Sequence, residues 1–433
     1  MSPLISDLPQ YPVRRLDRFP PRLALVSGVF IAIGVVTMIA ALLTNPDRAW
    51  QAYTFNWLFF AVVAQAAVLL GAVVTIARGL WSRPVRRFGL AFVAFLPIAY
   101  IILVPPLLIW APSHLFPWWQ HRPTGNTGFY LSTWFMVTRN VVFLGGLLLV
   151  SLWFAYWALR PDLRQEDDVP PRLRGLYARL TRGWRGQLEE ETLAHKRLSV
   201  LSPVMALLYV FAFSFVAFDF IMSLQQPHWV STLFGPYFFM GGFLGGIAAT
   251  FLVTLVCRRC LDLDQYIEGA NLHDLGKLLF AFCIFWAYLF WAQYMVQWYG
   301  NMPHEQIFLV IRLGKPYRPL TQFVLFALFI VPFFSLLGVK AKKTPGIAGF
   351  MTAVVLMGLW IERFILVYPT LYPHAESIPL GYPEVGIALG YLGIVLAALG
   401  WFKKTFPVIQ VWQPASEIEL MGKAVEVEGG AAD

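Results

Sequence analysis

Six ionisable side chains stand within or at the edge of long apolar runs of this 433-residue sequence. They are Asp274 and Lys277 in the stretch NLHDLGKLLFAF, together with Arg139, Asp219, Glu362 and Arg363. A charge surrounded by hydrocarbon is costly, so such residues are candidates for a functional role. Carboxylates in apolar surroundings can accept and release protons near neutral pH. Proton transfer is therefore the first chemistry that these residues indicate.

Structural ion pairing is the alternative explanation for four of these residues. Arg139 and Asp219 stand on consecutive apolar segments, which an antiparallel hairpin would bring together. Glu362 and Arg363 are neighbours that project about 100° apart on a helix, so each is expected to need a partner on another helix. The four charges sum to zero, as a set of ion pairs would. The sequence leaves both explanations open.

The histidines and cysteines argue against a redox centre in this chain. All seven histidines fall in predicted loops or at the ends of apolar segments, which argues against a haem held between histidines on facing helices. Cys257 and Cys260 have C-x-x-C spacing, but Cys283 is the third and last cysteine, and zinc or iron–sulfur sites need four ligands. We therefore predict that the chain binds no metal and no cofactor of its own.

The elements that must position the charged residues are ten apolar segments. Only 13% of the residues are charged, against roughly 25% in soluble domains, and 58% are hydrophobic. Segments of the roughly 20 residues needed to span a bilayer lie at 23–44, 54–77, 89–110, 129–159, 200–224, 233–256, 275–299, 318–338, 346–369 and 383–402. Backbone amides in hydrocarbon must be satisfied within each segment, so all ten are predicted to be helices of an all-α polytopic membrane protein.

Positive charge alternates along the chain. Of the 33 Lys and Arg residues, 25 lie in the N-terminal arm, the C-terminal tail and every second loop between them. This asymmetry predicts that residues 1–22 and 403–433 are cytoplasmic and flank a membrane domain at 23–402. It also explains the net charge of +9 without a nucleic-acid partner. Within the large cytoplasmic loop, 160–199, the pattern predicts one basic amphipathic helix lying on the anionic membrane surface, or alternatively a docking face for a partner.

The seventh segment has two polar stripes on different faces. On one face lie Asp274, Lys277, Tyr288 and Tyr299, and roughly opposite lie Trp286, Gln293, Gln297 and Asn301. Two half-channels that meet near the midplane would give this pattern, with a hydrophobic break between them to stop free proton leakage. A helix that packs between two bundles and donates hydrogen bonds to each would give the same pattern.

Several strings between about 220 and 305 resemble a known family. FDFIMSLQQPHW, STLFGPYFF, NLHDLGKLLFAF and WAQYMVQWYGNMPHE resemble the F subunit of bacterial alternative complex III, within the polysulfide-reductase/NrfD-like family. AYTFNWLFF, WSRPVRRF and the ten-segment count add weaker support. The resemblance implies two four-helix bundles, from segments two to five and six to nine, with the first and last segments beside them.

The resemblance also implies a function in a respiratory chain. The chain would be an integral subunit of a quinol:cytochrome c, or related acceptor, oxidoreductase in the bacterial cytoplasmic (inner) membrane, with no turnover alone. Its partners would be a paralogous NrfD-like C subunit, an iron–sulfur B subunit, multihaem and monohaem cytochrome c subunits, small membrane subunits and lipids. Haem c and iron–sulfur clusters would belong to those partners, while this chain would act as a scaffold and in proton translocation coupled to quinol oxidation.

Eight residues are candidates for that proton route. Asp219, Asp274 and Lys277 lie in the matching strings, whereas Glu362, Arg139, Arg363, Gln293 and Gln297 are chosen from their apolar surroundings and their helix face. One alternative gives the chain its own site for menaquinone or another quinone, formed by His228, Trp229 and Asp219. A secondary transporter is the other alternative, and the lack of obvious Gly- or Pro-broken helices in corresponding halves of the chain argues against it.

Overall fold

The computed structural model describes residues 15–412, except 17–18, 165–168 and 226–230. Throughout these ranges the chain is helical and has no strand. Ten helices or helix groups are long and apolar enough to cross a membrane. They are Pro21–Thr44 (α1), Pro46–Ile76 (α2), Arg86–Ile109 (α3 to α4), Thr133–Arg164 (α7 and η6), Gln187–Leu224 (α9 and η7), Phe234–Cys260 (α10), Gly269–Gly300 (α11), Arg318–Leu336 (α13 to α14), Pro345–Leu371 (α16) and Tyr382–Thr405 (α17). The chain is thus a multi-pass membrane protein of the predicted all-α class.

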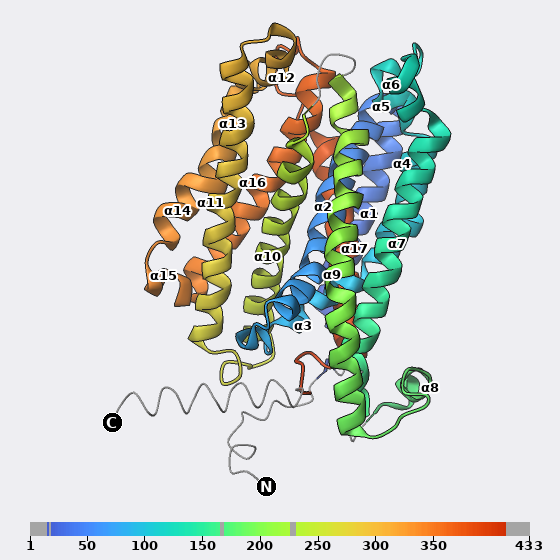
Figure 1. The fold of residues 1–433 in the computed structure, drawn as a ribbon, viewed down its shortest axis with the longest axis vertical. Helices are drawn as coiled ribbons and strands as arrows, with labels where there is room; N and C mark the ends of the chain where they lie inside the picture. Colours follow the sequence, from blue (N-terminus) through green and yellow to red (C-terminus); the bar gives the residue numbers. More distant parts are fainter. Residues whose placement is uncertain (1–14, 17–18, 165–168, 226–230, 413–433) are drawn as a thin grey trace.

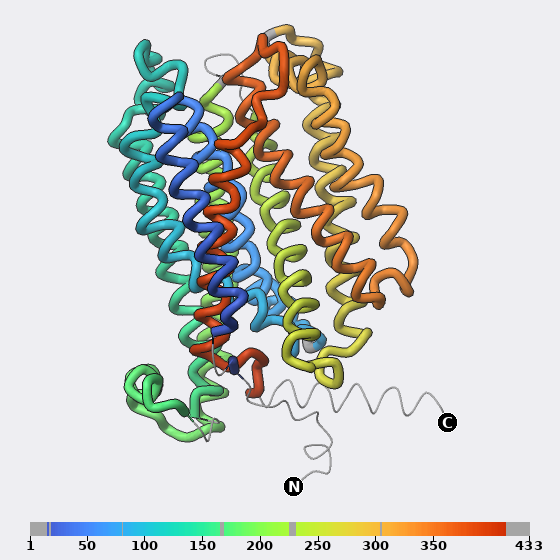
Figure 2. Tube along the Cα trace, turned by 180° about the vertical axis from the view of Figure 1, so that it is seen from behind, coloured from blue at the N-terminus to red at the C-terminus, as the bar shows by residue number. Residues whose placement is uncertain are grey.

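The ten spans form two adjoining bundles and one further helix pair (Figure 1). The first bundle comprises α2, the α3–α4 group, α7 and α9, and the second comprises α10, α11, the α13–α14 group and α16. Helix α10 packs along both α2 and α9 and joins the bundles. Helices α1 and α17 lie side by side against α2 (Figure 2). This arrangement agrees with the bundle composition that the family resemblance implies.

Glycines allow the closest of these helix contacts. A Cβ atom added to Gly34 of α1 would lie 2.3 Å from the Cα atom of Gly390 on α17. A Cβ atom on Gly246 of α10 would lie 2.5 Å from the carbonyl carbon of Ala66 on α2. Helices in lipid associate through such close backbone packing, because the hydrocarbon outside is as apolar as the side chains between them.

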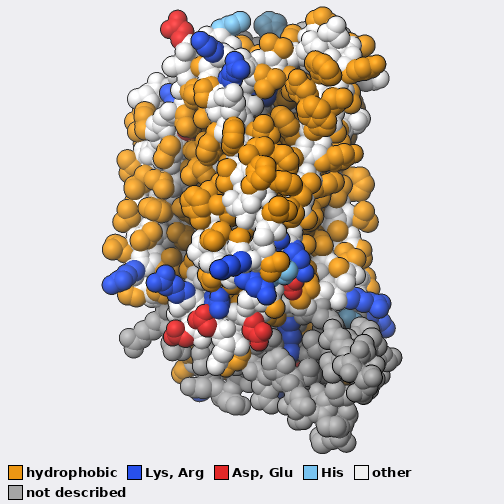
Figure 3. Space-filling model, turned by 90° about the vertical axis from the view of Figure 1, so that its left-hand side faces the viewer, with side chains coloured by type: hydrophobic (Ala, Val, Ile, Leu, Met, Phe, Trp, Pro, Cys, Tyr) orange, Lys and Arg blue, Asp and Glu red, His pale blue; other side chains and the backbone are white. Residues whose placement is uncertain are grey.

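The two ends of the molecule differ in their charge. Helices α2, α7, α10 and α17 finish at one end, which we name the basic end, and α15 (Val339–Lys343) places Lys340, Lys342 and Lys343 there. Figure 3 shows Lys and Arg side chains in a band toward this end and hydrophobic side chains across the middle. The opposite end carries α5 (Pro112–Leu115), α6 (Gly125–Tyr130) and α12 (Pro303–Leu313) (Figure 1). At the basic end the backbone amide of Leu16 donates to the carbonyl of Lys403 at 2.9 Å.

Two of the spans are interrupted helices. The third contains a 3-10 turn at Ala91–Ala94 and a π-helical turn at Ile98–Ile102, and the eighth contains a π-helical turn at Phe326–Ile330. Pro97 precedes the first π turn and Pro332 follows the second, and proline removes a backbone donor from the helical ladder. The third and eighth spans thus contain proline-associated irregularities, which weakens the argument from helix continuity against a transporter.

The loop at 160–199 does not form one helix. Helix α8 (Pro171–Leu180) ends before Gly183 and Gly186, whose φ angles are +73° and +125°. These conformations suit glycine and break the predicted continuous helix. Residues from Gln187 onward belong to α9, which continues without a break into the fifth span. The buried Arg160 Nε atom donates to Glu190 at 2.7 Å and ties the start of this loop to the base of α9.

Candidate functional site

Arg139 of α7 and Asp219 of α9 form a complete buried ion pair in the first bundle. Arg139 Nη2 lies 2.5 Å from Asp219 Oδ1, and Nε lies 3.2 Å from Oδ2. The amide of Asn140 also donates to Oδ2 at 2.6 Å, and the guanidinium lies 3.9 Å from the centre of the Tyr130 ring. Both carboxylate oxygens are therefore satisfied. The ion-pair explanation accounts for these two residues without a functional role.

Asp274 and Lys277 pair on the outer surface of α11. The Lys277 Nζ atom lies 2.6 Å from Asp274 Oδ1, and 56% of the lysine side chain is exposed. Tyr288 and Tyr299, on the same predicted stripe, are 62% and 85% exposed. This stripe faces away from the second bundle, so it does not line a channel inside this chain.

Glu362 of α16 lies at the centre of the second bundle and is incompletely satisfied. Its Oε1 atom accepts a hydrogen bond from Trp286 Nε1 at 2.9 Å. Its Oε2 atom lies 3.1 Å from Arg363 Nη1, but without the alignment of a hydrogen bond, and has no hydrogen-bond partner among the described residues. Each of these neighbours has a hydrogen-bond partner on another helix, as expected, and the long arginine side chain also reaches back toward the carboxylate.

The surroundings of Arg363 fix this geometry. Arg363 Nη2 donates to the carbonyl of Phe238 at 3.1 Å, and the guanidinium lies 4.1 Å from the centre of the Phe238 ring. Gly241, one turn further along α10, leaves room for the cluster, since a Cβ atom there would lie 3.3 Å from Arg363 Nη2 and 3.8 Å from Glu362 Oε2. Helix α10 thus holds the arginine over the carboxylate.

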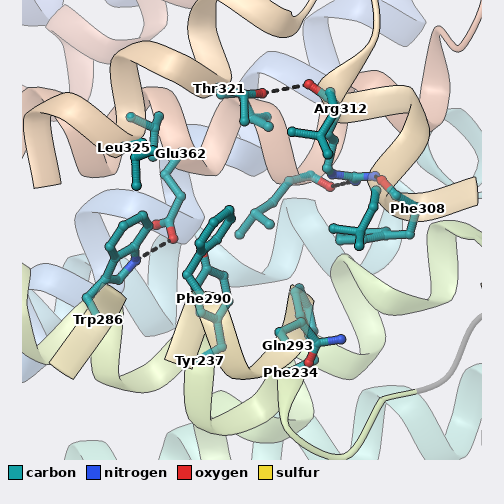
Figure 4. A pocket seen from close by; sticks show the side chains of 15 residues that line it. Phe234, Tyr237, Trp286, Phe290, Gln293, Phe308, Arg312, Thr321, Leu325 and Glu362 are labelled. Carbon is teal, nitrogen blue, oxygen red and sulfur yellow. Dashed lines mark hydrogen bonds between the residues drawn. The ribbon is translucent and has the colours of Figure 1, made fainter. Parts of the chain in front are cut away.

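A cavity of about 60 Å³ adjoins Glu362 (Figure 4). Its walls come from α10, α11, α12, the α13–α14 group and α16, and most of them are aromatic or aliphatic. Glu362 and Trp286 stand on one side and Arg312 of α12 on another (Figure 4). One water needs about 10–15 Å³ of this kind of space, so the cavity has room for a few waters.

Arg312 is a buried cation that the sequence analysis placed in a loop. Its Nη1 donates to the carbonyl of Phe308 at 2.8 Å, and its Nη2 donates to the carbonyl of Leu366 at 2.7 Å and to Thr370 Oγ1 at 2.8 Å. Its Nε finds no acceptor within the part of the chain that the structure describes. Burial lowers the pKa of Arg312 below its usual value, although a guanidinium still remains protonated at neutral pH.

Gln293 and Gln297 continue the inner face of α11 from Trp286 toward the opposite end. All three are buried, and eleven residues of helix correspond to roughly 16 Å. Gln293 Oε1 accepts from Ser231 Oγ at 2.8 Å, whereas the amide oxygen and nitrogen of Gln297 have no partner among the described residues. Toward the basic end the same face carries only apolar side chains, namely Leu272, Leu275, Leu279 and Cys283, which are fully buried. The inner polar stripe therefore ends at Trp286.

The structure brings together some of the predicted residues and separates others. Glu362, Arg363 and the Gln293–Gln297 stripe belong to one region, while the Arg139–Asp219 pair lies in the other bundle and the Asp274–Lys277 pair on the surface. His228 and Trp229, predicted for a quinone site with Asp219, lie outside the described residues. Within residues 15–412, less the gaps given above, no group of three or more His, Cys, Asp and Glu side chains is placed to hold a metal ion.

Glu384 is another buried carboxylate, and the sequence pattern did not single it out. It accepts from Arg48 Nε and Nη2 at 2.8 and 2.9 Å, from the Tyr368 hydroxyl at 2.8 Å and from the backbone amide of Gly381 at 2.7 Å. It joins α17 to α2 and α16 at the opposite end. Glu384 stands in the first turn of the segment predicted at 383–402, and this position at the edge of an apolar run could have identified it as a candidate.

The chemistry of the second-bundle site follows from these contacts. The site combines a buried carboxylate, one oxygen of which has no hydrogen-bond partner among the described residues, with a fixed guanidinium and a cavity that has room for water. The aromatic walls can also accept a flat ring. The sequence matches no family model and no curated protein, so the chain is identified by its own architecture, as a ten-helix polytopic membrane protein.

Proposed function

We propose that this chain is the cofactor-free membrane subunit of a bacterial quinol:acceptor oxidoreductase of the NrfD-like type, and that Glu362 takes up and releases protons during turnover. One observation carries the proton role. The Glu362 carboxylate is buried beside a cavity, and its Oε2 atom has no hydrogen-bond partner in the described part of the chain. Hydrocarbon penalises such an arrangement, so its presence favours a function over simple packing.

The neighbouring groups give the carboxylate two stable states. When Glu362 is ionised, Arg363 Nη1 at 3.1 Å offsets its charge and Trp286 donates to Oε1. When Glu362 is protonated, its carboxyl group has an O–H that can donate a hydrogen bond to water in the cavity. The carbonyl and the ring of Phe238 continue to hold Arg363. A change in the charge of a nearby partner could then shift the balance between the two states.

The polar and apolar parts of α11 define the direction of exchange. Gln293 and Gln297 offer hydrogen-bonding groups from the cavity toward the opposite end, whereas Leu275, Leu279 and Cys283 fill the inner face toward the basic end. We therefore expect Glu362 to exchange protons with the opposite end, which the charge distribution predicts to be periplasmic. Passage to the basic end would require a movement that parts the apolar side chains.

The outer face of α11 suits a scaffold. Trp291, Tyr294 and Trp298 stack successively on this helix, with ring centres 5.6 and 6.5 Å apart, and Lys277 and Asp274 extend the face toward the basic end. Aromatic and hydroxyl groups on the outside of a span suit contact with another membrane subunit. We assign this face to the paralogous C subunit, and we assign haem c and iron–sulfur clusters to the other partners.

The test is Glu362→Gln in the intact complex reconstituted into vesicles. We expect quinol oxidation to continue while the number of protons moved per electron falls. Asp274→Asn, which alters a partly exposed carboxylate paired with Lys277 on the neighbouring helix, is the matched control and should leave that number unchanged. Redox-induced infrared difference spectra give an independent readout, since a carboxyl band must disappear in Glu362→Gln. An unchanged proton number together with an unchanged spectrum would remove the proton role.

Quinone binding at the same cavity is the second candidate, and its aromatic lining favours it. Phe234, Tyr237, Trp286, Phe290 and Phe308 surround a space that has Glu362 as a proton acceptor and Arg312 as a donor. These residues would replace His228 and Trp229 in the predicted site. A quinol analogue should then stabilise the protein against heat, and Phe290→Ala should abolish that stabilisation. Equal stabilisation of both proteins would assign the analogue to another site.

A further inference from the structure

An apolar groove lies at the basic end between α7 and α17, far from Glu362 in the fold. It has a volume of about 320 Å³, and its lining includes Ala94, Pro97, Leu152, Ala155, Trp401 and Phe402. Leu152 and Trp401 are 39% and 52% exposed, so the groove opens sideways on the outer surface of the spans. By the measure used for the cavity at Glu362, this space corresponds to about 20 to 30 water molecules, which suits a stretch of hydrocarbon chain.

The local structure explains why the groove exists. Its floor is the interrupted third span, where the 3-10 turn Ala91–Ala94 and Pro97 replace regular α-helix. Ala94 and Ala155 present small side chains where larger ones would fill the space. An apolar hollow beside lipid has no polar partners for water, so acyl chains are its natural filling.

Helix α8 closes the groove at the basic end. Leu180 contributes to its wall, and the Tyr177 hydroxyl donates to the carbonyl of Thr405 at 2.8 Å, which fixes α8 to the end of α17. On the α7 side, Arg160 Nη1 donates to the carbonyl of Leu180 at 2.9 Å and to the Tyr156 hydroxyl at 2.5 Å. The groove is thus open toward the membrane interior and bounded at the depth where lipid headgroups lie.

The boundary is positively charged. Arg179 and Arg182 are exposed on either side of Leu180, and Lys404 lies one turn beyond Trp401 on the same side of α17. Among the described acids of this loop, Glu190 accepts from Arg160, Asp162 accepts from Arg87 at 2.5 Å, and Glu191 accepts from Gln187. Three cations therefore stand over an apolar groove.

We propose that this groove binds an anionic phospholipid, with one acyl chain between α7 and α17 and the phosphate beside Arg179, Arg182 and Lys404. Charge complementarity selects this occupant. A quinone tail would fill the same hydrocarbon space, but its neutral headgroup would leave the cationic boundary unused. The lipid would hold α8 against α17 and stabilise the basic end independently of any proton exchange at Glu362.

Native mass spectrometry of the delipidated protein, as purified from its membrane, tests the proposal. The probes are phosphatidylglycerol, phosphatidylcholine with the same acyl chains, and menaquinone. We expect phosphatidylglycerol to bind more tightly than phosphatidylcholine. The double variant R179Q/R182Q should lose about 25-fold in affinity for phosphatidylglycerol, because each basic residue near the surface adds a factor of about five. R174Q, an exposed position earlier on α8, is the matched control and should bind like the unaltered protein.

A second variant separates the contribution of the acyl chain to binding from that of the headgroup. Ala155→Leu fills the groove and should weaken phosphatidylglycerol binding while leaving the cations in place. Because Arg179 and Arg182 are exposed, their double variant should fold even if Ala155→Leu does not. Three results would each overturn the proposal. The two phospholipids could bind equally, R174Q could lose as much affinity as R179Q/R182Q, or menaquinone could compete with phosphatidylglycerol for the site that R179Q/R182Q weakens.

Discussion

The two bundles each bury an arginine and a carboxylate, but they satisfy them differently. In the first bundle, Asp219 accepts hydrogen bonds from Arg139 and Asn140 on both oxygens. In the second, Glu362 accepts a hydrogen bond from Trp286 on one oxygen, while its other oxygen lies 3.1 Å from Arg363 and has no hydrogen-bond partner among the described residues. The same residue types therefore form a fully hydrogen-bonded ion pair in one bundle and a partly hydrogen-bonded pair beside a cavity in the other. What distinguishes them is how many donors face the carboxylate and whether a cavity adjoins it.

Removing the carboxylate of the complete pair should have the largest effect on stability. Asp219→Asn leaves Arg139 as a buried charge without its partner, which typically costs 3–5 kcal/mol in folded proteins, so we expect a loss of about 4 kcal/mol. Thermal unfolding of the purified protein in detergent measures it. Glu362→Gln removes fewer contacts and should cost clearly less. Equal losses in the two variants would mean that the bundles hold their carboxylates alike.

Crowding the second site should have an intermediate effect. Gly241→Ala places a Cβ atom 3.3 Å from Arg363 Nη2, so the guanidinium must shift by a few tenths of an ångström. We expect a loss of about 1 kcal/mol and a change in the infrared band assigned to Glu362. Gly145→Ala in α7 is the control, because nothing lies within 4 Å of its added Cβ atom. That variant should be neutral or slightly more stable. Identical spectra for both variants would show that Gly241 does not position the pair.

Altering the exposed pair should have the smallest effect. Lys277→Met removes an ion pair whose lysine is more than half exposed, so we expect a loss of at most about 1 kcal/mol. Proton transfer through Glu362 should be unaffected, since the stripe faces outward. A fall in protons per electron without loss of stability would instead place a proton entry at Lys277, on the surface shared with a partner subunit.

The sequence predicts the spans well because their signal is local. Ten apolar segments appear at the expected places, although α2 begins at Pro46 rather than at 54, since Asp47 and Arg48 mask the start of its apolar pattern. The pairing of Arg139 with Asp219 also follows from consecutive antiparallel helices. These inferences need only chain order and hydrophobicity.

The site is less predictable because it depends on which helix faces meet. Periodicity gives the two stripes of α11, but it does not say that the stripe with Trp286 faces inward and that with Lys277 outward. Arg312 was missed because its short helix lies in a predicted loop, yet the helix folds back into the second bundle and buries it. The contact between Glu362 and Arg363 depends on side-chain rotamers, which sequence spacing does not specify.

The contact between α1 and α17 has a consequence for how the protein is made. Gly34 of α1 and Gly390 of α17 lie in contact. Helix α1 packs mainly against α17, and few of its residues are buried. During synthesis the first span can therefore make this contact only after Tyr382–Thr405 has entered the bilayer. A product truncated before Tyr382 would leave that face of α1 exposed to lipid. Membrane proteases could recognise such incomplete molecules by this exposed face.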